Sequence, residues 1–345
     1  MMAQRNSKYS YDGLLQKLIC KKNWSQSEAK KFFAALIAGR VDPEAARAFL
    51  ILLREKGESA VEIVSAAAAL RSKAKTLEVD LPFLVDNCGT GGDGKASFNV
   101  STVAAFIAAA AGAHVAKHGN RSVSSKVGSA DLLESLGVQI LAKPAKMLRA
   151  LREVGIGYFH APLYHPIMKR MQGIRKKIRG RTIFNLLGPL MNPLGVKRQV
   201  IGICREDLVP LFASSLEQLG AKRAFVICGA RGMDEATPFG KTRGIEIRNG
   251  RLYPFYLEAE KLGFRNSSER ELRGGSLRQN RAIALGILKG EIGGAKKDAA
   301  LLNSALTLLA SGVVSSLRDG LELSRVSVES GKAYLTLRKL VEITN

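Results

Sequence analysis

Two stretches of this sequence have the residue types of an anion-binding site. The first is a glycine-rich loop, Gly89-Thr-Gly-Gly-Asp-Gly94, and the second, Lys117 to Ser125, offers two cations and three hydroxyls. Backbone that carries no side chain can approach a phosphate closely, and the free amides at the start of a helix attract an anion. Asn99, Ser101 and Thr102 open a helix after the glycine loop. Together the two stretches predict a phosphate or pyrophosphate site.

The glycine loop by itself fits two nucleotide-binding patterns. Its GxGxxG spacing suits a dinucleotide, but that function needs an acidic residue about 20 positions further on, where the next strand ends in Lys117-His118. A P-loop needs a hydroxyl directly after its lysine, and here Ala96 follows Lys95. Both patterns are therefore disfavoured. A strand-to-helix turn without a ligand is the remaining alternative, and the second stretch, at the end of the adjacent strand, weighs against it.

Two further groups of charged residues draw attention. Asp234 and Glu235 are adjacent acids that follow a strand candidate ending at Cys228, and such a pair is most often part of a solvated loop. Arg175 lies between Lys169 and Arg181, in a segment with seven basic residues and no acid. The planar donors of an arginine suit a carboxylate, although an average arginine in such a segment is simply solvated.

The elements that would position these residues alternate along the chain. Tyr11 to Arg71 has the apolar spacing of short amphipathic helices, and the last stretch of about 65 residues returns to it. The strand candidates between them are Phe83 to Cys88, Ala113 to Lys117, Gln199 to Cys204, Arg223 to Cys228, and a hairpin of Gly244 to Arg248 and Leu252 to Tyr256 around Asn249-Gly250. This order predicts an α/β fold: a small all-helical N-terminal domain and a larger α/β domain with a mostly parallel central sheet flanked by helices.

Composition describes an ordinary folded chain with an unusual charge. Its 345 residues, 46% of them apolar, can bury a substantial core, and the longest small-apolar run, Val103 to Ala111, is far too short to span a bilayer. Four separated cysteines without a CxxC pair predict free thiols in a reducing cytoplasm. The 53 basic and 30 acidic residues give a net charge of +23, which predicts an anionic partner. A phosphorylated substrate, a nucleic acid and a generally basic proteome all stay open as its explanation.

The motifs resemble those of anthranilate phosphoribosyltransferases, which have a glycosyltransferase family 3 type fold. The match runs in the same order along nearly the whole chain. Beyond the two loops, it covers Asn99-Val-Ser-Thr102, Ala161-Pro-Leu-Tyr-His-Pro166, Arg181-Thr-Ile-Phe-Asn-Leu-Leu-Gly-Pro-Leu190, Met233-Asp-Glu235 and Leu272-Arg-Gly-Gly275. The resemblance implies a small helical domain of residues 1–80 with a returning segment at about 166–192, and a large α/β phosphoribosyl-pyrophosphate-binding domain of residues 81–345. It also implies a homodimer through the helical domain.

The resemblance assigns roles to individual residues. It implies that phosphoribosyl pyrophosphate contacts Gly89, Gly92, Asp93, Ser97, Asn99, Val100, Ser101, Thr102, Lys117, His118, Gly119, Asn120, Arg121, Ser122, Val123, Ser124, Ser125 and Ser129. Anthranilate is expected at Gly89, Asn120 and Arg175, and Mg²⁺, as two ions per subunit, at Asp234, Glu235 and the hydroxyl of Ser101. Ser122 and Ser129 are equally compatible with turn or cap roles, Ser129 before a helix that carries Leu132.

The implied reaction moves the 5-phosphoribosyl group from phosphoribosyl pyrophosphate to the amine of anthranilate, in tryptophan biosynthesis. No covalent nucleophile is expected, because departure of pyrophosphate leaves an oxocarbenium-like ribose that the amine attacks directly, while cations stabilise the leaving group. One alternative is a pyrimidine nucleoside phosphorylase-like enzyme, which the acids Asp234 and Glu235 disfavour. The other is a basic nucleic-acid-binding paralogue that retains the fold, which the aromatic content of 6% disfavours. No membrane partner is expected.

Overall fold

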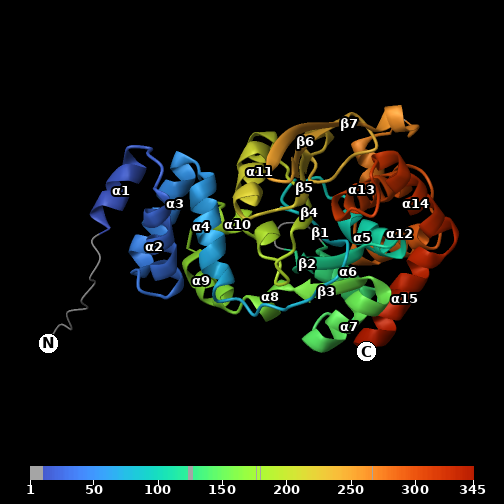
Figure 1. The fold of residues 1–345 in the computed structure, drawn as a ribbon, viewed down its shortest axis with the longest axis horizontal. Helices are drawn as coiled ribbons and strands as arrows, with labels where there is room; N and C mark the ends of the chain where they lie inside the picture. Colours follow the sequence, from blue (N-terminus) through green and yellow to red (C-terminus); the bar gives the residue numbers. More distant parts are fainter. Residues whose placement is uncertain (1–10, 123–126, 176, 179, 266) are drawn as a thin grey trace. The chain divides into compact units, whose positions relative to one another are not determined.

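The chain forms two compact units (Figure 1). The computed structural model describes residues 11–122, 127–175, 177–178, 180–265 and 267–345, except for the side chains of Gln172 and Arg175. The first unit, called here the helical unit, consists of Met1–Lys75 and His165–Met191. The second, the α/β unit, consists of Thr76–Tyr164 and Asn192–Asn345. The predicted limits were residues 1–80 with a returning segment at 166–192.

The helical unit contains four N-terminal helices and a short returning set. The N-terminal helices are α1 (Asp12–Ile19), α2 (Gln26–Ile37), α3 (Pro43–Lys56) and α4 (Ala60–Arg71). The returning set is α9 (Ile167–Arg175), α10 (Ile183–Leu186) and the 3₁₀ turn η1 (Gly188–Leu190). Ser25 and Ser59 begin α2 and α4 with capping boxes, and Asp42 caps α3 in front of Pro43. Local sequence therefore fixes where these helices start.

Aromatic packing holds the N-terminal helices together. The Trp24 ring lies with its centroid 4.8 Å from that of Phe32 and 6.0 Å from that of Phe49, and all three side chains are buried. Glu62, which is fully buried at the start of α4, accepts hydrogen bonds from the backbone of Trp24 and from Lys56. Glu62, part of the α4 capping box, thus also ties the loop before α2 to α4.

A seven-stranded sheet forms the centre of the α/β unit, with the strand order β3-β2-β1-β4-β5-β6-β7. Its strands are β1 (Leu84–Gly89), β2 (His114–Gly119), β3 (Ile156–His160), β4 (Arg198–Gly202), β5 (Arg223–Cys228), β6 (Lys241–Arg248) and β7 (Arg251–Glu258). The first five pair in parallel, and β6 and β7 continue the sheet as an antiparallel hairpin. The predicted mostly parallel sheet is confirmed.

The order of the strands reverses between β1 and β4. From β1 the chain winds outward to β2 and β3, and it then returns to the other side of β1 and winds outward to β5. Because crossovers between parallel strands are right-handed, the connecting helices α5 (Val100–Ala110) and α11 (Val209–Gln218) lie on opposite faces of the sheet. Ligands of such sheets bind outside the carboxyl ends of the strands at this reversal.

The remaining helices of the α/β unit pack on the sheet or on the helices that cover it. They are α6 (Ser129–Ser135), α7 (Pro144–Val154), α8 (Ala161–Tyr164), α12 (Leu277–Leu288), α13 (Ala295–Ser311), α14 (Leu317–Glu329) and α15 (Lys332–Thr344). Short 3₁₀ turns are η2 (Glu206–Leu208), η3 (Ala230–Gly232), η4 (Ala259–Leu262) and η5 (Glu269–Leu272). Most of α13 is buried, since it packs between α5, α14 and strands β1, β4 and β5. Among the described residues, no helix is both long and apolar enough to cross a membrane.

Two details differ from the sequence-based expectations. Strand β3 was not predicted: its five residues are all buried and follow Gly155 directly, without a loop of recognisable composition. The expectation that Ser129 caps α6 is wrong by one residue, because Gly128 occupies the cap position and Ser129 is the first helical residue. The Gly128 amide donates to Asp131 Oδ2 at 2.9 Å, so an acid inside the helix closes this end.

Candidate active site

The candidate site lies at the carboxyl ends of β1, β4 and β5, where the strand order reverses. Gly89 and Gly202 are register partners at the ends of β1 and β4, and Gly229 follows the end of β5. The loop that carries Asp234 and Glu235 crosses these ends. The acidic pair and the glycine loop were singled out separately from the sequence, and the fold brings them together at one edge of the sheet.

Glycine is required at these strand ends because the acidic loop lies directly against the backbone. A β-carbon at Gly89 would stand 2.1 Å from Asp234 Oδ2, and one at Gly202 would stand 1.6 Å from the Asp234 carbonyl oxygen. A β-carbon at Gly229 would stand 2.0 Å from the Glu235 carbonyl oxygen. The close approach of this one loop therefore requires glycine at the ends of three separate strands.

Three carboxylates converge in this position. Oxygens of Asp93, Asp234 and Glu235 all lie within 4.8 Å of one another. Asp234 Oδ2 accepts a hydrogen bond from the Gly91 amide at 2.8 Å, whereas Asp93 Oδ2 and Glu235 Oε2 are buried without a partner among the described residues. Burial and the neighbouring Asp93 charge raise the pKa of Asp234 to about 6, and burial with Asp234 raises the pKa of Glu235 well above its usual value. Unpaired carboxylate oxygens held this close fit a hard divalent cation such as Mg²⁺.

The glycine loop between β1 and α5 owes its shape to glycine and to a distant segment. Gly91, Gly92 and Gly94 have φ values of 66°, 80° and 68°, in the region that side chains rarely adopt. At its far end the Phe98 amide donates to the Leu272 carbonyl at 2.9 Å, and the Gly274 amide donates to the Ala96 carbonyl at 2.9 Å. The motif at residues 272–275 is therefore the support of the loop.

The start of α5 has no side-chain cap. Asn99 occupies the cap position, but its side chain makes no cap hydrogen bond and donates instead to the Val127 carbonyl at 3.1 Å. The amides of the first turn are consequently not covered by the side chain that precedes them. This arrangement suits a bound phosphate, which the helix dipole also favours.

Buried polar groups connect β1, β2 and α5 beneath the loop. The ammonium of Lys117 donates to the Asn87 carbonyl at 2.8 Å and to Ser101 Oγ at 3.3 Å. Asp86 accepts from Asn192 Nδ2 at 2.9 Å and from the His118 amide at 3.2 Å. Burial raises the pKa of Asp86 to about 6 and lowers the pKa of Lys117, and their opposite charges partly offset both effects.

The second predicted loop begins at the end of β2. His118 Nδ1 donates to the Phe159 carbonyl at 2.8 Å, which fixes the orientation of the ring. Arg121 forms ion pairs with Asp131 at 2.8 Å and with Glu134 at 2.9 Å, which hold the loop to α6. Val123, Ser124 and Ser125 lie outside the described residues.

Known proteins share the whole of this architecture. The helical bundle domain of a glycosyl transferase family matches residues 13–74, and the a/b domain of that family matches residues 81–334. An anthranilate phosphoribosyltransferase from Acetivibrio thermocellus is 44% identical over 331 residues, 96% of each chain. The chain belongs to the anthranilate phosphoribosyltransferase family.

Solved structures of this family have the same fold. The anthranilate phosphoribosyltransferase of Thermus thermophilus superposes with a TM-score of 0.89 at 40% identity, covering 96% of this chain and 98% of that one. A variant of the enzyme from Saccharomyces cerevisiae, solved with Mg bound, has a TM-score of 0.84 at 25% identity and covers 97% and 98%. The expected small helical domain and larger α/β domain with a mostly parallel sheet are confirmed as the fold of the family.

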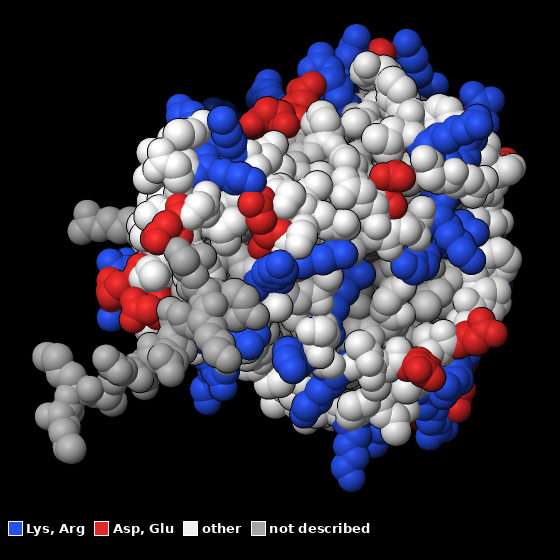
Figure 2. Space-filling view, turned by 60° about the vertical axis from the view of Figure 1, so that its left-hand side comes forward, with Lys and Arg blue, Asp and Glu red and all other residues white. Residues whose placement is uncertain are grey.

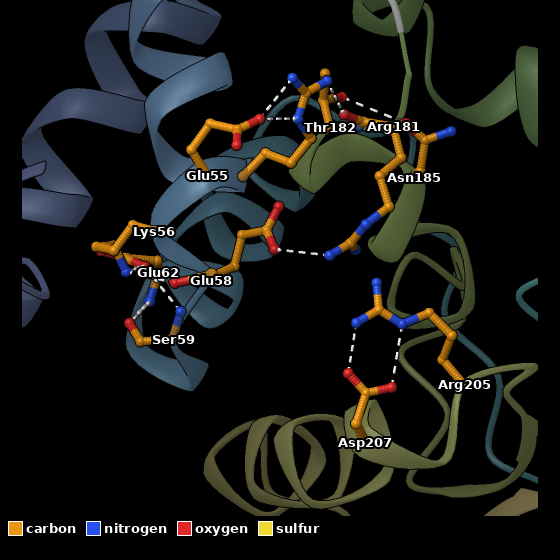
Figure 3. Close-up of polar contacts among 12 residues, drawn as sticks. Glu55, Lys56, Glu58, Ser59, Glu62, Arg181, Thr182, Asn185, Arg205 and Asp207 are labelled. Carbon is orange, nitrogen blue, oxygen red and sulfur yellow. Dashed lines mark hydrogen bonds and ion pairs between the residues drawn. The ribbon is translucent and has the colours of Figure 1, made fainter. Parts of the chain in front are cut away.

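The residues predicted to bind anthranilate are distributed over both units. Gly89 and Asn120 belong to the α/β unit, and Arg175 is the last residue of α9 in the helical unit, with its side chain outside the described part. Beyond α9, the Arg181 guanidinium points towards Glu58 and pairs with it at 3.4 Å (Figure 3). Arg54 donates to the Arg181 carbonyl at 3.4 Å. These contacts anchor the chain six residues after Arg175 in the helical unit.

The structure adds residues that sequence reasoning missed. Asp93 was assigned to phosphoribosyl pyrophosphate, and the structure places it with Asp234 and Glu235. No roles were predicted from the sequence for Asp86, Asn87 and Asn192. The first two were detectable as polar residues inside the buried strand β1. The other predicted residues lie as follows: Gly92 and Ser97 in the glycine loop, Val100, Ser101 and Thr102 in the first turn of α5, Gly119 at the end of β2, Ser122 in the second loop, and Ser129 at the start of α6.

Proposed function

We propose that this protein transfers the 5-phosphoribosyl group of phosphoribosyl pyrophosphate to anthranilate. The products are N-(5-phosphoribosyl)anthranilate and pyrophosphate, and the reaction belongs to tryptophan biosynthesis. The observation that carries the proposal is the meeting of the glycine loop, the start of α5 without a side-chain cap, and three carboxylates where the strand order reverses. Such a site offers both an anion cradle and a cation site, which a pyrophosphate leaving group needs.

The phosphoribosyl pyrophosphate site consists of the glycine loop, the first turn of α5 and the loop after β2. Backbone amides and hydroxyls of residues 89–102 receive the pyrophosphate, and the buried Lys117 supplies a cation between β1 and α5. Arg121 forms ion pairs with Asp131 and Glu134, and so it stabilises the conformation of the second loop. Ser129 contributes similarly, since its hydroxyl lies 3.3 Å from the Asn120 carbonyl.

The carboxylates of Asp234 and Glu235, with Asp93 beside them and the hydroxyl of Ser101, would hold two Mg²⁺ ions per subunit. The raised pKa values of Asp234 and Glu235 and the buried, unpartnered oxygens of Asp93 and Glu235 support this assignment, because a dication would offset both the desolvation and the mutual repulsion of these carboxylates. When bound, Mg²⁺ neutralises charge on the departing pyrophosphate. Dependence on Mg²⁺ is part of the proposal.

The chemistry requires positioning more than a reactive side chain. The bond between ribose C1 and pyrophosphate oxygen breaks, a bond between C1 and the anthranilate nitrogen forms, and that nitrogen releases one proton. Burial raises the pKa of the thiols of Cys88 and Cys204, and raises that of Cys228 to about 11, so these thiols stay protonated near neutral pH. This supports direct transfer without a covalent enzyme intermediate.

For the acceptor, we propose that Arg175 binds the carboxylate of anthranilate and that Gly89 and Asn120 border its ring. The support is chemical: a guanidinium presents two parallel donors to a carboxylate. The ion pair of Arg181 with Glu58 keeps the following segment attached to the helical unit, which limits the movement available to Arg175.

Two alternatives make different predictions. A nucleoside phosphorylase would act on a pyrimidine nucleoside with inorganic phosphate and without metal, and it would have no use for three converging carboxylates. A nucleic-acid-binding protein would show a continuous basic stripe. On the face that Figure 2 shows, lysine and arginine side chains are instead spread out and interspersed with acidic ones.

A homodimer through the helical unit is proposed from the family resemblance, and the exposed Ile19 of α1 is available for such contact. We also propose a cytoplasmic location, in line with four cysteines that are all free.

Product analysis separates these functions. Purified protein is incubated with anthranilate, phosphoribosyl pyrophosphate and Mg²⁺, and the products are identified by mass spectrometry. Phosphoribosylanthranilate and pyrophosphate in equal amounts are expected, and the parallel incubation of uridine or thymidine with phosphate is expected to give no free base. Phosphorolysis of the nucleoside without a phosphoribosylated product would overturn the proposal.

A further inference from the structure

A buried amide on α13 holds the peptide that follows the metal-binding pair. Ala236, directly after Asp234 and Glu235, donates its amide hydrogen to Asn303 Oδ1 at 3.0 Å. The Asn303 amide nitrogen donates back to the Ala236 carbonyl at 2.8 Å. One side chain thus binds both polar groups of a single residue, which fixes the orientation of that stretch of backbone as well as its position.

The side-chain oxygen and both amide hydrogens of Asn303 take part in hydrogen bonds. Its second amide hydrogen goes to the Ala299 carbonyl at 2.8 Å, one helical turn earlier, and its side chain is buried. Rotating the amide by half a turn would place like groups against each other in all three contacts, so the geometry is fixed. The two hydrogen bonds between Asn303 and Ala236 are called here the Asn303 clamp. Because α13 packs against β1, β4 and β5, the clamp fixes the acidic loop relative to the strands that end at the site.

The backbone of the acidic loop is also held at its start and along the strand ends. The Gly229 amide donates to the Met233 carbonyl at 2.8 Å and closes the loop before the pair. Gly89, Gly202 and Gly229 lie against it so closely that side chains are excluded. The start of the loop is therefore closed, and the strand ends pack tightly beneath it. Asn303 holds the residue directly after the acidic pair, and the next residue, Thr237, is held separately by Thr242 Oγ1, which accepts its amide hydrogen at 3.2 Å.

A small cavity joins Asn303 to the carboxylates. Its lining includes Asn303 and Thr307 of α13, Ser101 of α5, and the pair Asp234 and Glu235. Its volume of about 10 Å³ admits the centre of one water molecule. The space in which Glu235 can reorient is thus bounded by the helix that carries the clamp.

We propose that Asn303 is a positioning residue for cation binding: by holding the Ala236 peptide it aims the carboxylates of Asp234 and Glu235, and so sets the affinity of the site for Mg²⁺. The inference rests on the proposed function, in which this pair holds the metal. It assigns Asn303 no contact with substrate or metal.

The test measures metal affinity without turnover. Mn²⁺, which takes the same oxygen ligands, is titrated into the whole protein and followed by electron paramagnetic resonance. Asn303→Ala leaves both polar groups of Ala236 unpaired, and Asn303→Asp keeps the shape but loses both donors. Each is expected to weaken Mn²⁺ binding by about tenfold or more, as changes to residues that orient metal ligands do, while kcat at saturating Mg²⁺ falls far less.

The matched control is Ser304→Ala, at the next position of the same helix. Ser304 is equally buried and accepts a hydrogen bond from Ser324 at 2.8 Å, away from the acidic loop. This variant is expected to lose thermal stability but to bind Mn²⁺ like the wild type. If both Asn303 variants bind Mn²⁺ as the control does, the positioning role is overturned. If Asp234→Asn also binds Mn²⁺ like the wild type, the metal assignment itself is wrong, and the positioning role falls with it.

Discussion

The α-carbon of Gly202, the last residue of β4, lies directly against the carbonyl of Asp234, so that a β-carbon at Gly202 would stand 1.6 Å from that oxygen. This contact belongs to backbone and cannot be relieved by rotating a side chain. Gly202→Ala must therefore displace the loop that carries both acids. We expect kcat/KM to fall by about 100-fold or more, because displacements near 1 Å have effects of this size.

Gly293→Ala is the control for that substitution. It adds the same methyl group in the same unit, where a β-carbon meets no atom within 4 Å. We expect its activity and its circular dichroism spectrum to match those of the wild type. Equal activity of Gly202→Ala and Gly293→Ala, both folded, would show that the acidic loop does not need its observed position.

Asp234 is predicted to destabilise the metal-free protein at neutral pH. Its pKa of about 6 in the folded state lies above the value of about 4 for a free aspartate. Its protonated form thus contributes stability that is present below about pH 4 and is lost as the pH rises through 6. In EDTA at about pH 8, the free energy of unfolding of Asp234→Asn should exceed that of wild type by about 1–3 kcal/mol. At about pH 4 the two proteins should be equally stable.

Excess Mg²⁺ supplies the second half of that experiment. The ion should stabilise wild type but not Asp234→Asn, because binding to the folded state adds to stability. A variant that is less stable than wild type in EDTA at about pH 8 would contradict the assigned repulsion among Asp93, Asp234 and Glu235.

Glu58 and Glu55 offer a paired test of the helical unit (Figure 3). The Glu58 side chain is 1% exposed and pairs with Arg181, whereas the Glu55 side chain is 63% exposed and pairs with Arg54. Glu58→Gln should cost about 1–2 kcal/mol, since it weakens a partly desolvated ion pair, and Glu55→Gln about 0.5 kcal/mol or less. Urea denaturation gives both values, and equal costs would mean that the Arg181 pair does not anchor its segment.

Arg175→Ala tests the assignment of the anthranilate carboxylate. Loss of charge-assisted hydrogen bonds should raise KM for anthranilate about 10- to 100-fold, with KM for phosphoribosyl pyrophosphate changed about twofold at most. Arg175→Lys should be intermediate, because an ammonium cannot present two parallel donors. Lys169→Ala, an exposed position on the same helix, serves as the control. An unchanged KM for anthranilate in Arg175→Ala would remove this residue from the acceptor site.

The framework of the α/β unit was readable from sequence because its signals are local. Strands β1, β2, β4 and β5 are short segments bounded by glycine-rich or polar turns, and the Asn249-Gly250 turn marks the hairpin. Strand β3 escaped prediction because Ile156–His160 is buried throughout and shows no alternation. The cap of α6 was misassigned because Gly128, which has no side chain to serve as a sequence signal, occupies the cap position, and Asp131 inside the helix accepts its amide hydrogen.

The candidate site was predictable only in part, for a physical reason. Glycine loops and adjacent acids are visible in sequence, but their meeting depends on the reversal of strand order between β1 and β4. Asn303 lies 67 residues from Ala236, and Gly202 lies 32 residues before Asp234, so neither contact leaves a local pattern. Such supporting residues emerge only when the chain is folded.

Mg²⁺-dependent phosphoribosyl transfer should require Asp234 and its neighbours. Its most direct test is the initial rate at which anthranilate fluorescence disappears on addition of phosphoribosyl pyrophosphate, measured against Mg²⁺ concentration. We expect the rate of wild type to saturate with Mg²⁺ and to vanish in EDTA, and the rate of Asp234→Asn to be at least about 100-fold lower. Constant fluorescence with folded wild-type protein and Mg²⁺, or a rate that neither EDTA nor Asp234→Asn reduces, would contradict it.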